Sequence, residues 1–201
     1  MIRALFTDFG GVLVRSRTDA PRRALEVRLG LPPNTIEERV FGGDLSVRAQ
    51  RGEISHDDYW EHLGRDLPLD GRMTVAQFRD EFFSADFLDE ALMALIRSVR
   101  PSIKTGLISN AWANGRYIFT EVFAIASAFD TLVISAEEKV MKPDPRIYHI
   151  ALDRLGVAAG ESIFIDDMLP NVRGAEAVGM IGVHFQPADQ AIQEIRRLLA
   201  R

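Results

Sequence analysis

The sequence predicts an α/β protein built on a doubly wound, mostly parallel sheet, with an α-helical subdomain inserted after the first strand. Three observations predict this class. Short apolar runs bounded by polar or turn residues recur along the chain, helical stretches alternate with the later runs, and a long helical segment interrupts the alternation. At 201 residues the chain is long enough for one domain that carries such an insertion.

The apolar runs are expected to form buried strands of a parallel sheet. Because a parallel strand is covered on both faces, it reads as a continuous apolar run and not as an alternation of apolar and polar residues. The expected strands are residues 4–8, 104–109, 131–135, 163–166 and 181–185.

Helices are expected to alternate with the later strands, over residues 144–156, 168–178 and 188–200. The first of them has a clear start at Asp144-Pro145, since Asp is a favoured N-cap and Pro is favoured at the first helical position. Gly156 and Gly179 are the expected stops of the first two helices. This alternation is typical of βαβ units.

Residues 15–90 break the pattern, because they show amphipathic helical periodicity and no convincing strand. We therefore expect a core domain of residues 1–14 and 91–201 and a helical cap subdomain of residues 15–90. Ligands of open α/β sheets bind beyond the carboxyl ends of the strands, so an insertion leaving from the first strand would cover such a site. The expected helices are residues 20–29, 35–41, 44–51, 55–64, 74–83 and, leading back into the core, 88–99.

The composition is that of a soluble globular protein, with 47% hydrophobic and 26% charged residues. The net charge of −5 disfavours nucleic acid and anionic membranes as partners. The absence of cysteine excludes disulfides, thiolate chemistry and cysteine-bound metals. We find neither a signal peptide nor an apolar run of about 18 residues, the length that a membrane span needs. The expected location is the cytoplasm, and the expected state is a monomer or homodimer.

Polar side chains follow four of the expected strands. Asp8 ends the first, Ser109-Asn110 the second and Asp166-Asp167 the fourth, while Lys142-Pro143 lies between the third strand and the next helix. Each alone has an ordinary interpretation as a helix cap, a turn or a solvated loop residue. Together they indicate one site, because the carboxyl ends of parallel strands meet at the same edge of a sheet.

In this order, the four segments resemble the four motifs of the haloacid dehalogenase-like hydrolase superfamily, and the resemblance covers the whole chain. The helical insertion resembles the small α-helical cap of the branch that contains phosphoglycolate phosphatase, haloacid dehalogenases and sugar-phosphate phosphatases. The matching segments are Asp8-Phe9-Gly10-Gly11-Val12-Leu13, Leu107-Ile108-Ser109-Asn110, Lys142-Pro143-Asp144-Pro145-Arg146-Ile147-Tyr148 and Phe164-Ile165-Asp166-Asp167-Met168-Leu169-Pro170-Asn171-Val172-Arg173-Gly174-Ala175.

The resemblance implies a Mg²⁺-dependent hydrolase that cleaves a small phosphate monoester, such as a sugar phosphate, through an aspartyl-phosphate intermediate. Asp8 would be the nucleophile and a metal ligand. The other implied ligands are Asp166, Asp167 and the carbonyl oxygen of Gly10. Ser109 and Lys142 would be catalytic, the first by hydrogen bonding a phosphoryl oxygen and the second by neutralising charge. The substrate would also contact Asn110 and the backbone of Phe9, Gly10 and Gly11.

Gly10 stands where the family usually carries a second Asp, which acts as general acid and base. Glycine cannot transfer a proton, and such help is typically worth about 10²–10⁴-fold in rate. A metal ion would need only the carbonyl of this residue. The leaving group could depart as a stabilised anion, or the cap could supply a proton donor, for which His56, Asp57 and Asp58 are candidates.

Two other functions stay open. A 2-haloacid dehalogenase also lacks the second Asp, and its nucleophile attacks carbon without a metal. The Asp166-Asp167 pair argues against it, because paired carboxylates have an obvious use only beside a cation. The third interpretation is a catalytically weakened member that acts as an interaction domain.

Several further side chains are expected to pack or to support the site. Trp60 should pack within the cap and Trp112 near the site entrance, whereas Asn171, one helical turn after Asp167, should steady the metal ligands. His184 is expected to be an ordinary histidine at the edge of the core. Phe82, Phe83 and Phe87 are expected along the seam between cap and core.

Overall fold

A computed structural model describes residues 1–69, 71, 73–186 and 188–199, and its main element is a sheet of five parallel strands. The spatial order is β5-β4-β1-β6-β7, with the first strand of the chain at the centre. The sheet confirms the predicted fold class and, within one or two residues at each end, all five predicted strands. These are β1 (Ala4–Thr7), β4 (Lys104–Ser109), β5 (Thr131–Ile134), β6 (Ser162–Asp166) and β7 (Ile181–His184).

The register of the sheet brings the strand ends together. Thr7 of β1 lies opposite Leu107 of β4 on one side and opposite Ile165 of β6 on the other. The polar residues that follow these three positions therefore emerge at one edge of the sheet.

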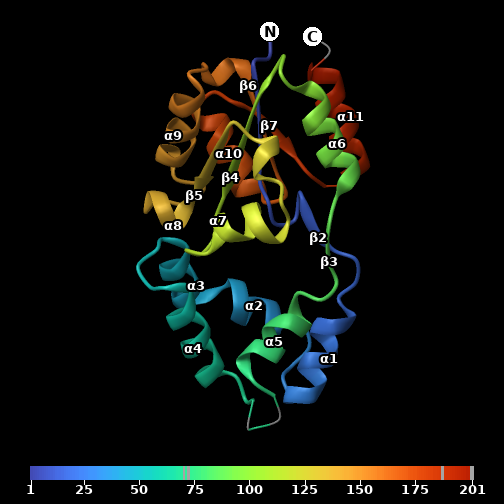
Figure 1. Cartoon of the computed structure of the whole chain (residues 1–201), viewed down its shortest axis with the longest axis vertical. Helices are drawn as coiled ribbons and strands as arrows, with labels where there is room; N and C mark the ends of the chain where they lie inside the picture. Colours follow the sequence, from blue (N-terminus) through green and yellow to red (C-terminus); the bar gives the residue numbers. More distant parts are fainter. Residues whose placement is uncertain (70, 72, 187, 200–201) are drawn as a thin grey trace.

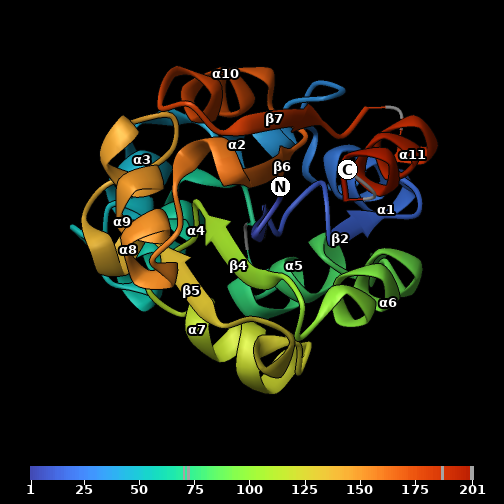
Figure 2. The same ribbon diagram turned by 90° about the horizontal axis from the view of Figure 1, so that it is seen from above.

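Helices cover both faces of the sheet, as Figure 2 shows from above. One face packs against α6 (Glu90–Val99), α11 (Ala188–Leu199) and the short turns η1 (Ile118–Val122) and η2 (Ala126–Ala128). The other packs against α9 (Pro145–Leu155) and α10 (Leu169–Ala177). Three short helices complete this part: α7 (Gly115–Tyr117), α8 (Ser135–Glu138) and η3 (Ala159–Glu161). Among the described residues, no helix is long and apolar enough to cross a membrane.

The predicted helix signals of α9 are confirmed. The Asp144 carboxylate accepts a hydrogen bond from the Arg146 backbone N–H at 2.9 Å, and Gly156 ends the helix with a φ of 61°. Gly179 does not directly follow the last helical residue, contrary to the prediction for the second helix. α10 ends at Ala177, and Gly179 lies two residues later with a φ of 95°. The turns between residues 110 and 130 had not been predicted, since they are too short for a helical period to show.

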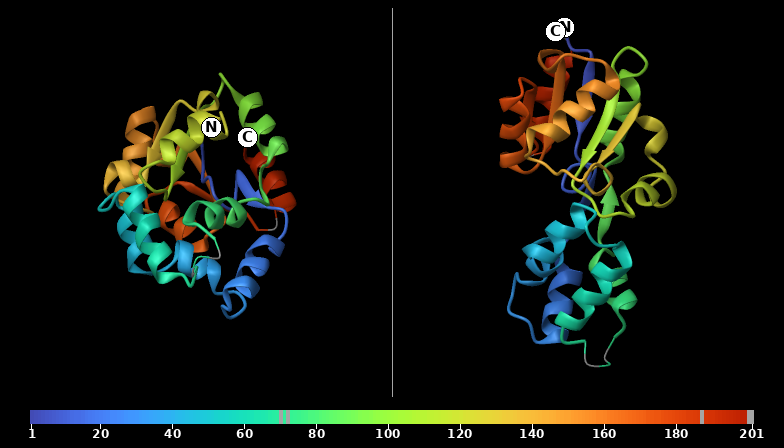
Figure 3. Two further views of the ribbon diagram at one scale, coloured as in Figure 1. Left: turned by 60° about the horizontal axis from the view of Figure 1, so that its bottom comes forward. Right: turned by 90° about the vertical axis from the view of Figure 1, so that its left-hand side faces the viewer.

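A separate group of helices, which we call the helical unit, lies beyond the carboxyl edge of the sheet (Figures 1 and 3). It has its own core, which includes Tyr59, Phe78 and Phe82, all fully buried. The N-terminus and the helix α11 lie at the opposite end of the molecule (Figure 1). The helices are α1 (Ala20–Leu29), α2 (Ile36–Phe41), α3 (Gly43–Gln50), α4 (His56–Asp66) and α5 (Val75–Phe82).

Two connecting segments join the helical unit to the sheet, and each contains a short strand. The expectation that residues 15–90 contain no strand was therefore wrong. The strands β2 (Val14–Ser16) and β3 (Asp86–Leu88) pair antiparallel. Each has only three residues, too few to show an alternating pattern, and their pairing joins segments far apart in the sequence. The predicted helix 88–99 accordingly begins later, at Glu90, with the Asp89 carboxylate accepting from the Leu92 N–H.

Candidate active site

Three carboxylates meet where β1 and β6 end. Asp8 directly follows β1, and its backbone N–H donates to the Ile165 carbonyl at 2.8 Å. Asp166 is the last residue of β6, and Asp167 follows it. Carboxylate oxygens of Asp8, Asp166 and Asp167 lie within 4.8 Å of one another. Adjacent parallel strands therefore produce the acidic cluster that the sequence predicts.

Lys142 lies inside this cluster. Its side chain is fully buried, and its Nζ lies 2.7 Å from Asp8 Oδ1 and 2.7 Å from Asp166 Oδ2. The ammonium group also sits over the Phe164 ring, 5.4 Å from its centroid. One buried cation thus bridges two of the three carboxylates.

Asn110 fixes the backbone of Lys142. Its amide nitrogen donates to the Lys142 carbonyl at 3.0 Å, and its amide oxygen accepts from the Lys142 N–H at 2.8 Å. The end of β4 is thereby tied to the loop that carries the lysine. Ser109, the last residue of β4, is buried with 3% of its surface exposed.

The Asp166 carboxylate is also held from the side of α10. Asn171 Nδ2 donates to its two oxygens at 3.1 and 3.2 Å, and the Met168 N–H donates to Oδ1 at 2.8 Å. Asn171 therefore steadies the acidic cluster from one helical turn away, as the sequence predicts.

The charges of the cluster are unbalanced. The pKa of Asp8 is raised to about 7, because burial and the nearby Asp166 charge outweigh the opposing effect of the Lys142 ammonium. Burial and the Asp166 charge likewise raise the pKa of Asp167. Burial lowers the pKa of Lys142, but the charges of Asp8 and Asp166 outweigh it and the net shift is upward. One ammonium does not neutralise three carboxylates, so a further cation would stabilise their ionised forms.

Gly11 makes room for Asp167. A Cβ atom at Gly11 would lie 2.3 Å from Asp167 Oδ2, and the φ of this residue is +75°. Asp167 is held on its other side by His184, whose Nε2 donates to the Asp167 carbonyl at 2.8 Å. The sequence interpretation missed this contact. The signal for it is positional, since His184 ends β7 directly beside Asp166.

The turn after β1 corrects one expectation about substrate binding. The Gly11 N–H donates to the Val14 carbonyl at 2.9 Å, so this amide is already engaged. The reason is a tight reversal in which Phe9 O accepts from the N–H groups of Leu13 and Val14. Within the nucleophile turn, Phe9 and Gly10 remain as candidates for binding phosphoryl oxygens through the backbone.

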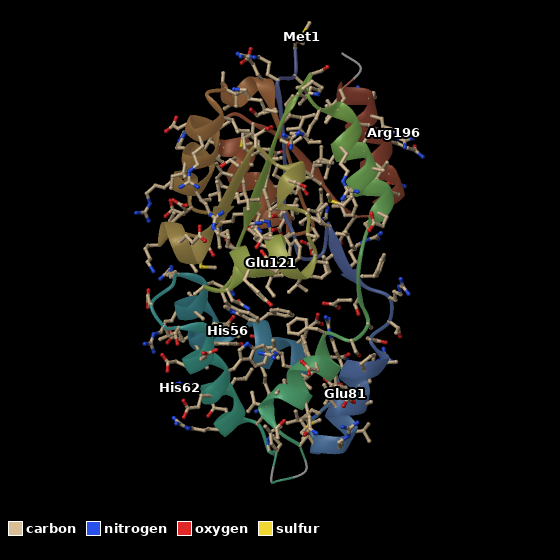
Figure 4. All side chains as sticks on the ribbon, viewed as in Figure 1. Met1, His56, His62, Glu81, Glu121 and Arg196 are labelled. Atoms are coloured by element: carbon tan, nitrogen blue, oxygen red, sulfur yellow. The ribbon has the colours of Figure 1, made fainter. Side chains whose placement is uncertain are left out.

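The proposed proton donors of the helical unit are engaged elsewhere. His56 Nε2 accepts from Trp60 Nε1 at 3.0 Å, and its Nδ1 lies 3.0 Å from Asp57 Oδ1. Asp58 receives a hydrogen bond from Ser55 Oγ, which in turn caps α4 through the Asp58 N–H. Figure 4 shows His56 in the helical unit. These contacts favour a helix start over a catalytic role.

Some of the aromatic residues lie inside the core of the helical unit, and Trp112 contacts that core from outside. Trp60 is 4% exposed and packs within the helical unit, as predicted. Phe82 belongs to the same core and is fully buried, which corrects its expected place on the seam. Trp112, from the loop after β4, packs against that cluster and so lies between the two parts of the molecule.

The fold and the site define an α/β protein whose acidic centre lies at the carboxyl edge of a parallel sheet. A family model described as haloacid dehalogenase-like hydrolase matches residues 2–179. The chain therefore belongs to the haloacid dehalogenase-like hydrolases.

Relatives within this family include named phosphatases. The sesquiterpene phosphatase astK of Aspergillus oryzae is 31% identical over 80% of this chain and 82% of its own. A D-ribitol-5-phosphate phosphatase of Bacteroides thetaiotaomicron is 26% identical over 95% and 94%. The chain spans only 19% and 39% of the length of some longer curated relatives.

A solved structure shares the fold. It is a haloacid dehalogenase family enzyme from Bacteroides thetaiotaomicron in complex with magnesium and inorganic phosphate. The TM-score is 0.73 at 20% identity, and the match covers 92% of this chain and 94% of that one.

Proposed function

We propose that this enzyme hydrolyses small phosphate monoesters with Mg²⁺, through an aspartyl-phosphate formed on Asp8, and that the helical unit acts as its cap. The observation that carries the proposal is the cluster of three carboxylates around the buried Lys142. The phosphatase relatives support the reaction class, and the magnesium and phosphate of the structural neighbour support the cofactor.

The residues present fit Mg²⁺. The ion prefers hard oxygen ligands, and three carboxylates converge here with an excess of negative charge. Asp8, Asp166, Asp167 and the Gly10 carbonyl would hold it. When bound, it would neutralise the phosphate group and so reduce its repulsion of an attacking carboxylate.

Each of the chain's own residues then has a separate role in the reaction. A carboxylate oxygen of Asp8 attacks phosphorus, the bond from phosphorus to the ester oxygen breaks, and the leaving group departs as its anion, which takes a proton from water to become the alcohol. Lys142 holds Asp8 in place and neutralises charge, and the Ser109 hydroxyl donates a hydrogen bond to a phosphoryl oxygen. Water then cleaves the aspartyl-phosphate, which releases phosphate and restores Asp8.

The direct test is phosphate release from a panel of esters with Mg²⁺ and with EDTA. We expect hydrolysis that EDTA abolishes and added Mg²⁺ restores, because the carboxylates alone would repel the substrate. Chloride release from 2-chloropropionate without metal would instead select a dehalogenase. If neither phosphate nor chloride is released and another protein co-purifies with this one, the interpretation as an interaction domain is favoured.

Two substrate classes deserve places in this panel. A sugar or sugar-alcohol phosphate is our first candidate, as for the D-ribitol-5-phosphate phosphatase relative. A phosphate with a hydrocarbon group is the second. It is favoured by Phe41, which is 42% exposed and stacks on Trp112 two residues after Asn110, and by the sesquiterpene phosphatase relative.

Gly10 offers a test of the missing proton donor. Nothing lies within 4 Å of a Cβ built at Gly10, so Gly10→Asp should fold normally. We expect it to raise turnover of alkyl phosphates, by up to about 10²–10⁴-fold where protonation of the leaving group limits the rate. Turnover of p-nitrophenyl phosphate should change little, because that leaving group departs readily as an anion.

The matched control is Gly11→Asp, one residue further along. Its Cβ would collide with the Asp167 carboxylate, so this variant should lose activity on every ester. An unchanged ratio of alkyl to aryl rates in Gly10→Asp would refute a catalytic need for the missing acid.

A further inference from the structure

The helical unit touches the rest of the molecule on the side opposite its two covalent connections. In Figure 1, β2 and β3 lie on the right-hand side of the molecule, whereas α3 approaches α8 on the left. Polar contacts between residues 50–52, at and just after the end of α3, and residues 135–139 join the parts there. We call these contacts the α3–α8 latch.

Ser135 is the centre of the latch. It is fully buried, and its hydroxyl donates to the Gln50 carbonyl of the helical unit at 2.6 Å. The same oxygen accepts from the Ala111 N–H at 3.0 Å. Ala111 lies two residues after Ser109, the proposed ligand of the phosphoryl group. One hydroxyl therefore links the helical unit to the loop that carries this serine.

Gly52 permits the close approach. Its φ is +63°, and a Cβ there would lie 2.2 Å from the Ala136 carbonyl oxygen. The Lys139 ammonium donates to the Gly52 carbonyl at 2.7 Å. The absence of a side chain at Gly52 thus lets this segment lie against α8, and Gly52→Ala would force the two segments apart.

Trp112 extends the same loop into the helical unit. Its ring stacks on Tyr59, with centroids 4.8 Å apart, and on Phe41, with centroids 5.9 Å apart. The loop of residues 109–112 is therefore held at Ala111 by Ser135 and at Trp112 by the helical unit.

We propose that Ser135 is a positioning residue that couples docking of the helical unit to the geometry of the Ser109 loop. Its donated and accepted hydrogen bonds share one oxygen, so each strengthens the other. Release of the helical unit removes the acceptor at Gln50, so that the hydroxyl turns to the Ala111 carbonyl 3.2 Å away. It also removes the packing of Trp112, and the two changes together alter the geometry of the loop. The docking part stands on the contacts alone, whereas the effect on catalysis rests on the proposed phosphatase function.

Trp112 reports on docking without any assay of activity. The chain has two tryptophans, so Trp60→Phe leaves Trp112 as the single emitter. In this background, Ser135→Ala and Gly52→Ala should shift the emission to longer wavelength and increase quenching by acrylamide. The first variant removes the hydroxyl, and the second acts from the other side of the latch. Unchanged emission in both variants would overturn the latch.

Kinetics test the coupling. Ser135→Ala should weaken inhibition by inorganic phosphate and raise KM about three- to tenfold, the range expected for loss of one hydrogen bond. Gly52→Ala should act in the same direction, although it leaves every residue around the acidic cluster intact. If emission shifts while phosphate inhibition and KM stay at wild-type values, the coupling is refuted.

Two matched controls separate these effects from general destabilisation. Ser162→Ala removes another fully buried hydroxyl, which donates to the Ala158 carbonyl at 3.0 Å at the far end of β6. Gly30→Ala adds a Cβ at a φ of +65° with nothing within 4 Å. Neither should shift Trp112 emission or phosphate inhibition. If the protein has no phosphatase activity, the emission measurements still decide the latch.

Discussion

Replacing Asp8 with Asn is expected to abolish turnover, with a loss on the order of 10⁴–10⁶-fold, as when other enzymes lose a covalent nucleophile. Asn has nearly the shape of Asp but cannot attack phosphorus to form the intermediate. Phosphate release at saturating Mg²⁺ measures the loss. Asp80→Asn, at a carboxylate with 75% of its side chain exposed, is the control and should keep wild-type activity. Wild-type turnover in Asp8→Asn would rule out the covalent mechanism.

Asp8→Asn is expected to raise the stability of the metal-free protein, although it abolishes turnover. Burial raises the pKa of Asp8 from 3.8 to about 7, so the folded protein binds this proton more tightly than the unfolded chain. Between about pH 4 and pH 7 the ionisation of Asp8 therefore reduces stability as the pH rises. In EDTA, Asp8→Asn should gain stability relative to wild type between pH 5 and pH 8. The unfolding temperatures of the variant and the wild type at pH 5 and pH 8 measure this gain. If the difference between the two proteins is the same at both pH values, the prediction is wrong.

The parts of the fold that the sequence predicts are those with a long or repeated signal. Continuous apolar runs identify all five parallel strands, because burial on both faces removes the polar alternation. The pair β2 and β3 has no such signal, since three residues do not define a period and the pairing joins segments far apart in the sequence. Phe82 illustrates the same limit, because apolar character does not reveal which of two cores a residue joins.

The site divides in a similar way. Asp8 and Asp166 are predictable together, because strand ends that share an edge must bring their side chains close. Lys142 lies in the loop after α8 and not at a strand end, so its place between the two carboxylates is indicated by the motif resemblance alone. Hydrogen bonds of the backbone are not predictable from residue type, and they decide the roles of Gly11 and His184. The Gly11 amide is taken by Val14, and His184 donates to the Asp167 carbonyl.

Ser135 shows why contacts between distant segments escape sequence reasoning. A serine after a strand is typical of a helix start. Only the folded molecule brings Gln50, from the other part of the protein, to its hydroxyl.

Lys142→Met is expected to lower the free energy of unfolding by roughly 3–5 kcal/mol at pH 8, the usual cost of breaking a buried ion pair. Methionine matches the length of the side chain but leaves the Asp8 and Asp166 carboxylates without their cation in the metal-free protein. The interaction with both carboxylates raises the pKa of Lys142, so its stabilising contribution is fully present at neutral pH and is lost only in strong alkali. Urea unfolding in EDTA measures the cost. Lys104→Met is the control, because Lys104 is exposed and its ammonium group donates to a neutral acceptor, the Leu155 carbonyl.

Acidification and a second substitution identify the cause of this loss. At pH 5 the Asp8 carboxyl, with its pKa raised to about 7, is protonated in the folded protein, so the cost of Lys142→Met should shrink. Asp8→Asn should have the same effect at pH 8, because it removes one of the two uncompensated charges. The double variant Lys142→Met/Asp8→Asn should therefore be more stable than Lys142→Met alone, and the coupling energy of the cycle measures the ion pair. A double variant no more stable than Lys142→Met, with a cost unchanged at pH 5, would mean that lost packing and not unpaired charge explains the role of Lys142 in the fold.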